Sequence, residues 1–399
     1  MRGACRSFRA SRLGEVSGRC VIDARYVRTR PSGIGRYVAA LIERLPALAP
    51  DTRFRLWTHP ELPTPMVAPN VTCHSVTAVA DGLRTLFNPA SLDALSAEDV
   101  IHFPFSLLGR GLPCPTVVTI HDLMWLEEPE KVDARPLLRN VRASFYQAGM
   151  RHALTQATRL IAVSHATADR IIAVSPGSAE RVRVIHNAAG PAFVPPADLE
   201  AAARRAAQLI GSDEPYYLVI GKNEPYKAHQ LVLEAFAREA RENELLVLLQ
   251  RTRRGAGLER LAERLGIVSK IRWLPTLNEQ ELVTVLQAAQ ALMQPSLVEG
   301  FGIPALEAMA AGCPVIASDT PALVEVLGGA GLHAKVGDAA GLATAMAKVR
   351  DRSFRLELRE RGLERARAFS WDAAARDTVE VYRDAANAGP GAQPRRARA

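Results

Sequence analysis

Short apolar runs alternate with helical stretches along almost the whole chain, and this alternation limits the folds that the chain can adopt. Parallel strands joined by helices are buried on both faces, so each strand is apolar throughout. The alternation therefore predicts an α/β fold of doubly wound parallel sheets. The expected strands are 20–24, 54–58, 100–103, 116–120, 160–163, 182–185, 216–220, 245–249, 271–274, 291–293 and 314–317.

A break in this pattern divides the chain into two similar halves. The 399 residues exceed what a single hydrophobic core usually supports. Residues 190–196 read Gly-Pro-Ala-Phe-Val-Pro-Pro and interrupt the alternation. We therefore expect two Rossmann-like domains, residues 20–192 and residues 197–370, that face each other across a cleft.

The net charge of +8 is concentrated at the two ends of the chain. Residues 1–19 contain five arginines and one glutamate, and residues 388–399 contain three arginines. The body of the chain is therefore close to neutral, and a nucleic-acid partner is not expected. We expect both ends to be disordered, the first as a basic leader without the apolar stretch of a secretory signal.

The cysteines and the apolar runs indicate the compartment. The five cysteines are scattered without a Cys-x-x-Cys pair, which argues against a cysteine metal site and a disulfide framework. A reducing cytosol fits this pattern best. No uncharged apolar run approaches the roughly 18 residues that span a bilayer. We therefore expect a cytoplasmic protein.

Residues 295–307 combine a glycine turn with a helix start. They read Pro-Ser-Leu-Val-Glu-Gly-Phe-Gly-Ile-Pro-Ala-Leu-Glu and follow an expected strand. Gly300 and Gly302 allow positive φ and a close approach of the backbone to a ligand. Pro304 suits the first position of a helix, and the free amide groups of a helix start attract phosphate.

Two carboxylates flank this turn, Glu299 before it and Glu307 in the first helical turn. One interpretation is that Glu307 only complements the helix dipole and that the glycines only shape a loop. The combination of strand, glycine turn, helix start and paired acids favours a nucleotide-sugar site instead.

Lys222 and Lys227 follow the first expected strand of the second half. Solvated surface lysines are the simplest interpretation of each one alone. Two cations at such a turn would also neutralise a diphosphate leaving group, and the Glu299 turn in the same half favours this role. The chain has no Asp-x-Asp triplet and no spaced His/Cys cluster, so we expect no bound metal.

Polar residues of the first half also follow expected strands. His121 and Asp122 come directly after residues 116–120. A histidine there can donate a hydrogen bond or move a proton near neutral pH, although it can also simply cap a loop. His102, in the strand 100–103, is equally consistent with a structural role.

Residues 33–37, Gly-Ile-Gly-Arg-Tyr, open a helix after the first strand and a loop. Val38 stands where a dinucleotide fingerprint requires its third glycine, which argues against a Rossmann dehydrogenase. A loop that approaches a donor or an acceptor remains the expectation. Asp23, at the end of the first strand, would accept a hydrogen bond from a sugar hydroxyl or cap the loop.

These residues share a position, because ligands of doubly wound sheets bind beyond the carboxyl ends of the strands. We therefore expect ligand groups of both halves to meet in the cleft between the domains. The residues that follow expected strands are His121, Asp122, Ser164, Asn187, Lys222 and Glu299.

The helical stretch 137–155 mixes apolar residues with arginines. Such a helix can contact an anionic membrane surface. A half-buried helix with one solvated face gives the same pattern, and the sequence does not separate the two interpretations.

The chain resembles the retaining glycosyltransferases of family 4, which have the GT-B fold. Glu299 and Glu307 fit that family's two glutamates separated by seven residues, and residues 300–302 fit its phosphate loop. Lys222 and Lys227 match its basic pair. Further similar stretches are 163–164, 184–187, 318–319, 325–326 and 369–371.

The resemblance implies a nucleotide sugar held mainly by the second domain. Glu307 would bind the ribose, Glu299 the transferred sugar, and Lys222 with Lys227 the diphosphate. His121 would contact the donor sugar near the reacting centre, and the anomeric configuration would be retained without a metal or another cofactor. The implied catalytic residues are His121, Glu299, Lys222 and Lys227. The implied donor contacts are Gly35, Lys222, Lys227, Glu299, Gly300, Phe301, Gly302, Ile303 and Glu307. The acceptor-side candidates are Asp23, Arg36, Tyr37 and Asp122.

The resemblance also implies that a last helix, residues 371–387, returns to the first domain. Residues 22–25 and 33–37 are similar to those of bacterial mannosyltransferases of polysaccharide assembly. We therefore expect a hexose, mannose from GDP-mannose, to move to a lipid-linked or growing polysaccharide acceptor, with contact to the inner membrane surface. The alternatives are an epimerase-like GT-B enzyme that acts without transfer, and a sugar-nucleotide-binding protein without catalysis.

Overall fold

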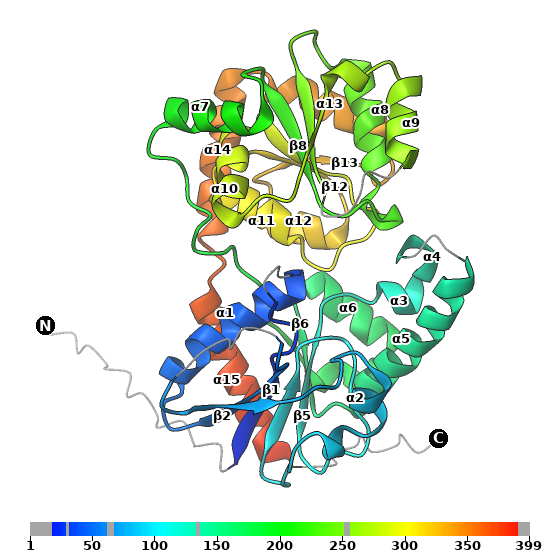
Figure 1. Cartoon of the computed structure of the whole chain (residues 1–399), viewed down its shortest axis with the longest axis vertical. Coiled ribbons are helices and arrows are strands. Elements are labelled where there is room, and N and C mark those ends of the chain that lie inside the picture. Colours follow the sequence, from blue (N-terminus) through cyan, green and yellow to red (C-terminus); the bar gives the residue numbers. More distant parts are fainter. Residues whose placement is uncertain (1–17, 29–31, 62–67, 133–135, 251–255, 390–399) are drawn as a thin grey trace, which may run out of the picture.

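The computed structural model describes residues 18–28, 32–61, 68–132, 136–250 and 256–389. They form two α/β domains, one above the other in Figure 1. Most of the two chain ends predicted to be disordered lies outside these residues. One boundary was wrong, because Arg19 is the first residue of a strand and its guanidinium pairs with Asp99 at 2.7 Å.

The first domain contains a seven-stranded sheet in which all strand pairs are parallel. Its order places β1 inside the sheet, between β2 and β4, as expected for a doubly wound sheet. From edge to edge, the strands are β3 (Val71–Ser75), β2 (Arg53–Thr58), β1 (Arg19–Asp23), β4 (Val100–Phe103), β5 (Thr116–Ile120), β6 (Arg159–Ala162) and β7 (Val182–Val184).

Helices cover both faces of this sheet. Cys20 and Ile22 of β1 pack with α1 (Gly33–Leu48) on one face. Val21, between them, packs on the opposite face with α5 (Pro136–Gln156) and α6 (His165–Val174). The shorter helices are α2 (Leu83–Phe87), α3 (Met124–Glu127) and α4 (Pro129–Val132).

The second domain contains a six-stranded sheet, also parallel in every pair. All eleven expected strands lie within one residue of an observed strand at both ends, whereas β3 and β13 were not predicted from the sequence. In order, the strands of the second sheet are β10 (Ile271–Leu274), β9 (Leu245–Leu249), β8 (Tyr216–Ile220), β11 (Ala291–Gln294), β12 (Val315–Ser318) and β13 (Leu332–Ala334).

Two layers of helices enclose the second sheet. One face carries α7 (Leu199–Ile210), α10 (Glu279–Ala288), α11 (Ile303–Ala310) and α12 (Pro321–Leu327). The other carries α8 (His229–Glu239), α9 (Ala256–Arg264) and α13 (Ala339–Val349), and α14 (Arg352–Ala366) follows. None of the helices in the described part of the chain is long and apolar enough to cross a membrane.

The last helix, α15 (Trp371–Ala388), lies in the first domain beside α1, as Figure 1 shows. Trp371 and Tyr382 are buried in the core that α1 shares with β1. The chain therefore crosses between the domains twice, before α7 and before α15.

A buried chain of hydrogen bonds ties α15 to the sheet. His102 contacts the Tyr382 hydroxyl through Nδ1 and the Thr119 hydroxyl through Nε2, each at 2.8 Å. Tyr37 of α1 contacts the same Thr119 hydroxyl at 2.9 Å. Burial lowers the pKa of His102 to about 3, so the imidazole is neutral and structural, which fits one of its two interpretations.

We predict that Tyr382→Phe destabilises the first domain by about 1–3 kcal/mol, because it leaves His102 Nδ1 buried without a partner. Urea unfolding of the full chain measures the change. Asp377→Asn, at an exposed position of the same helix, is the control and is expected to stay within about 0.5 kcal/mol of the wild type. Equal stability of the two variants would show that the hydrogen-bond chain contributes nothing.

Candidate active site

The turn between β11 and α11 presents its backbone at the carboxyl end of the second sheet. Gly302 caps α11 with a φ of +102°, a conformation that glycine adopts without strain. A Cβ atom at this position would stand 2.6 Å from Leu323 Cδ2. Pro304 occupies the second position of α11, one later than predicted, where a backbone N–H is not needed.

Glu299 is held by three hydrogen-bond donors on one carboxylate oxygen. Oε2 accepts from Lys227 Nζ at 2.8 Å and from Gln294 Nε2 and Ser296 Oγ at 3.1 Å each. The Lys227 and Glu299 side chains are 15% and 14% exposed. The predicted sugar-binding acid and one predicted diphosphate-binding base therefore form an ion pair shielded from most solvent.

Lys227 stays positively charged in this setting. Burial lowers the pKa of its ammonium group, but the charge of Glu299, the Tyr226 hydroxyl and the hydrogen bond to Glu299 outweigh burial, so the pKa is raised. The ammonium also lies 5.0 Å from the centre of the Tyr226 ring. A permanent cation is thus fixed beside Glu299 at neutral pH.

Gly300 joins the two domains through its backbone. A Cβ atom here would stand 1.7 Å from the His121 carbonyl oxygen, so only glycine fits. The Gly300 carbonyl accepts hydrogen bonds from Ser164 Oγ at 2.7 Å and Thr167 Oγ1 at 3.0 Å, both at the start of α6. The contact brings the loop after β5 against the loop after β11, as the strand-end argument predicts.

His121 is neutral at physiological pH. Burial lowers the pKa of its imidazole to about 4, although the contact with the Pro104 carbonyl opposes this. Nε2 donates to that carbonyl at 2.9 Å, so Nδ1 carries no proton and can only accept. The Tyr37 ring and the imidazole pack nearly perpendicular to each other, with ring centres 5.0 Å apart. Of the expected roles, hydrogen bonding fits this environment and proton transfer near neutral pH does not.

Asp122 lies beside the same ion pair. Burial raises the pKa of its carboxyl group to about 6, and the negative charge of Glu299 adds to the shift. The Met124 amide donates to Asp122 Oδ1 at 3.0 Å and opposes it. A small cavity between Asp122, Glu299 and Arg170 connects the first domain to the Glu299 turn.

A second pair of predicted site residues meets across the cleft. Arg36 Nη1 of α1 contacts Glu307 Oε1 of α11 at 2.5 Å. The two residues line a cavity of about 310 Å³ between the domains, together with Gly35 and Ile303. Arg36 Nε is buried and has no hydrogen-bond partner among the described residues. Glu307 is therefore already neutralised by the opposite domain.

The remaining predicted site residues belong to neither of these two ion pairs. Asp23 is 1% exposed and both of its carboxylate oxygens accept from Arg25, and Tyr37 is also 1% exposed. Their acceptor roles stay predictions. Lys222 is exposed in the turn after β8, and among the described residues its side chain forms no ion pair, so its role at the diphosphate stays a prediction.

Several polar residues of this site were not predicted to act in it. Gln294 and Ser296 orient Glu299, and Thr167 binds Gly300. Gln294 carries a signal, because it is a polar residue at the end of the apolar strand β11. Glu325, noted only as part of a similar stretch, accepts from the His165 and Ala166 amides at 2.8 and 2.9 Å.

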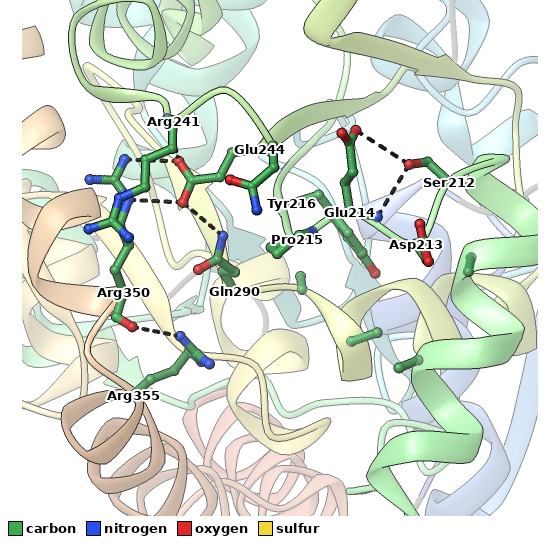
Figure 2. Close-up of a pocket in the computed structure, with 15 residues that line it drawn as sticks. Ser212, Asp213, Glu214, Pro215, Tyr216, Arg241, Glu244, Gln290, Arg350 and Arg355 are labelled. Atoms are coloured by element: carbon green, nitrogen blue, oxygen red, sulfur yellow. Dashed lines mark hydrogen bonds and ion pairs between the residues drawn. The ribbon is translucent and has the colours of Figure 1, made fainter.

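A larger cavity, of about 390 Å³, lies at the other end of the strands of the second sheet, away from the Glu299 turn. Figure 2 shows Glu244 between Arg350 and Gln290 there, at the amino ends of β8, β9 and β11. Arg350 Nε pairs with Glu244 Oε1 at 2.8 Å. The cavity contains none of the predicted site residues, and its basic side chains are balanced by acidic ones.

Comparisons with known proteins identify the class. The family model described as Glycosyl transferases group 1 matches residues 200–369, and that described as Glycosyltransferase Family 4 matches residues 31–192. The chain belongs to glycosyltransferase family 4. It is accordingly a retaining enzyme that transfers a sugar from a nucleotide sugar, and the predicted family and activity class are confirmed.

Two curated relatives illustrate the range. A D-inositol 3-phosphate glycosyltransferase of Streptomyces avermitilis is 27% identical over 88% of this chain and 82% of its own length. The O-antigen chain mannosyltransferase B of Escherichia coli is 35% identical over 42% of this chain and 45% of its own length.

Solved structures support the predicted GT-B fold. Sucrose-phosphate synthase from Thermosynechococcus elongatus matches with a TM-score of 0.72 and 20% identity over 91% of this chain and 98% of that chain. Anabaena HepE, in complex with UDP and glucose, matches with a TM-score of 0.66 and 17% identity over 90% of this chain and 98% of that chain.

We predict that Gly300→Ala lowers turnover by about a hundredfold or more, because the methyl group meets a backbone carbonyl and forces the two domains apart. Gly257→Ala is the matched control, since a Cβ atom there contacts nothing within 4 Å. Nucleoside diphosphate release from a nucleotide sugar measures the rate. Wild-type turnover of Gly300→Ala would mean that the observed approach of the domains is not needed for the reaction.

We also predict a pH-dependent effect of Asp122→Asn. The folded-state pKa of Asp122 is raised to about 6, so the folded protein holds a proton that the unfolded chain releases. Wild-type stability is therefore lost as pH rises from about 4 to about 6. The variant should gain stability relative to the wild type by about 3 kcal/mol between these limits. Urea unfolding at several pH values tests this, and a pH-independent difference would contradict the buried carboxyl.

Proposed function

We propose that the donor is GDP-mannose and that the acceptor is a lipid-linked or growing polysaccharide. The sequence similarity of residues 22–25 and 33–37 to bacterial mannosyltransferases supports mannose. The similarity to an O-antigen chain mannosyltransferase, 35% identical over 173 residues, supports both parts of the proposal. The observation that carries the proposed sugar-transfer site itself is the Lys227–Glu299 pair beside the Gly300–His121 contact.

In this proposal the ribose, the sugar and the diphosphate are bound by different groups, and Lys227 both orients Glu299 and faces the diphosphate. The Glu307 carboxylate accepts hydrogen bonds from the ribose hydroxyls, and the ribose shares or replaces its contact with Arg36. Glu299 accepts from hydroxyls of mannose, while Lys227 keeps it oriented. His121 accepts a further sugar hydrogen bond at Nδ1, because Nε2 is already engaged.

The reaction needs no group that this site lacks. The acceptor hydroxyl attacks the anomeric carbon on the face from which GDP departs, and the bond between that carbon and the phosphate oxygen breaks. The proton of the acceptor hydroxyl passes to the departing phosphate. Lys222 and Lys227 neutralise the charge that develops on the diphosphate, in place of a metal ion. Contact between the domains excludes water, which limits hydrolysis.

A lipid-linked acceptor requires an approach to the inner membrane surface, and the first domain offers one. Leu83 and Phe87 of α2 are 66% and 60% exposed, and Val141 of α5 is 73% exposed. Asp81, two residues before α2, accepts a hydrogen bond from Tyr146 of α5 at 3.0 Å, which ties the start of α2 to α5. Arg110 lies over the Phe87 ring. In this cytoplasmic, peripheral arrangement the apolar side chains contact the bilayer and the arginines its anionic headgroups.

Two variants test the assignments together. Glu307→Gln should weaken GDP about tenfold or more, because the lost charged hydrogen bonds involve the ribose. Glu299→Gln should bind GDP as the wild type does but lose mannosyl transfer, because GDP lacks the sugar. Calorimetry with GDP and product analysis with GDP-mannose measure the two effects. Unchanged GDP affinity in Glu307→Gln would contradict the ribose assignment.

The donor itself is identified by a thermal-shift panel of GDP-, UDP- and ADP-sugars. Ligand at about a hundred times its Kd stabilises a protein by about 2.7 kcal/mol, so the true donor should raise the melting temperature by several degrees. GDP-mannose should give the largest rise. A larger rise with a UDP-sugar would reject GDP-mannose while leaving the transferase class intact.

A further inference from the structure

A cluster of two histidines and one glutamate lies where the two domains meet, outside the Glu299 turn. His165 is the first residue of α6, His186 follows β7, and Glu325 belongs to α12. One ligand atom from each side chain lies within 4.8 Å of the other two. The first two side chains come from the first domain and the third from the second.

We propose that this cluster is a binding site for a divalent transition metal ion, with zinc as the best fit. Imidazole nitrogen with a carboxylate oxygen is a donor set that zinc takes and that magnesium and calcium do not favour. Ligand atoms of a tetrahedral zinc ion lie about 3.3 Å apart, given bonds of about 2.0–2.1 Å. Small side-chain rotations bring the three atoms to this spacing. The proposed transfer reaction uses no metal ion, so an ion bound here would have a different role.

Two of the three ligands are already oriented. The Glu325 carboxylate accepts from the His165 and Ala166 amides at 2.8 and 2.9 Å, which fixes its plane. The His186 ring packs against Phe301 and Phe369, with ring centres 6.0 and 5.5 Å away. Such surrounding contacts orient metal ligands in known sites.

The proposed ion would take the place of a proton that two of the ligands share. His186 Nε2 and Glu325 Oε1 are 2.7 Å apart and share a hydrogen bond. Zinc takes the place of that shared proton, and His165, whose ring centre is 5.6 Å from that of His186, turns in as the third ligand. The His186 and Glu325 side chains are 34% and 18% exposed and His165 is exposed, so an ion and its bound water can enter.

Binding there joins the domains next to the proposed reaction centre. The start of α6 that carries His165 also holds the Gly300 carbonyl through Ser164 and Thr167. An ion that links α6 to α12 therefore restrains the separation of the domains. Because product release requires the domains to separate, the ion slows transfer, and this last step rests on the proposed function.

Calorimetric titration of zinc chloride into chelator-treated full-length protein tests the site. We expect one zinc ion per chain, with magnesium chloride giving no competing signal. His165→Ala, which removes an exposed ligand, and His186→Ala should each lower zinc affinity by at least about tenfold. His333→Ala, at an exposed histidine elsewhere in the second domain, is the matched control and should bind as the wild type does. Wild-type affinity in both His165→Ala and His186→Ala overturns the proposal.

A second measurement tests whether bound zinc slows sugar transfer. Zinc should slow sugar transfer by the wild type and by His333→Ala, and should affect His165→Ala much less. Equal inhibition of wild type and His165→Ala overturns the proposed control of domain separation. Absence of transfer with every donor would reject the proposed function alone, because the calorimetric result on the zinc site does not depend on activity.

Discussion

The active-site geometry depends on one reciprocal contact between the domains, at the start of α6. Ser164 and Thr167 donate hydroxyl hydrogen bonds to the Gly300 carbonyl of the second domain. In the other direction, the Glu325 carboxylate receives the first free amides of α6. A carboxylate is favourable at a helix N-terminus, where unpaired N–H groups carry partial positive charge. Burial alone would raise the pKa of Glu325. The hydrogen bonds from His186 and from these amides outweigh burial and hold the pKa below its usual range, so the carboxylate stays charged. The contact fixes Gly300, and Gly300 fixes Glu299.

The two glutamates of the candidate site are neutralised from different domains. Lys227 neutralises Glu299 within the second domain, whereas Arg36 neutralises Glu307 from the first. The first pair keeps an acid and a base charged while they are largely removed from water, since an unpaired buried charge is costly. Under the proposed ribose assignment, Arg36 and the ribose would compete for the Glu307 carboxylate. Donor binding at Glu307 would then act directly on this ion pair between the domains.

Much of this architecture could be predicted from the sequence, because buried parallel strands are apolar throughout. β5, β8, β9 and β10 have the predicted bounds. The two strands that were not predicted, β3 and β13, lie at sheet edges and are partly exposed, so they are not apolar throughout. The strand-end rule placed His121 and Glu299 in one region. It could not show that Arg36 would pair with Glu307, because 271 positions separate them and only the approach of the two domains brings them together. The hydrogen-bonding state of His121 is likewise a product of burial, not of sequence position.

Burial also decides which groups can move a proton. His121 sits against Tyr37 and donates Nε2 to a carbonyl, so lowering of its pKa to about 4 leaves a neutral acceptor at physiological pH. Asp122 is closer to neutrality, with a pKa of about 6, but at pH 7 it is mostly ionised and Glu299 adds a second negative charge nearby. Two acids beside a permanently charged lysine favour the positive charge that gathers on an anomeric carbon as its phosphate departs. In the proposed reaction the departing phosphate oxygen gains negative charge on the face from which the hydroxyl attacks, so it can take the hydroxyl proton as the bond to the anomeric carbon breaks. Neutral His121 then acts as a hydrogen-bond acceptor and not as the base.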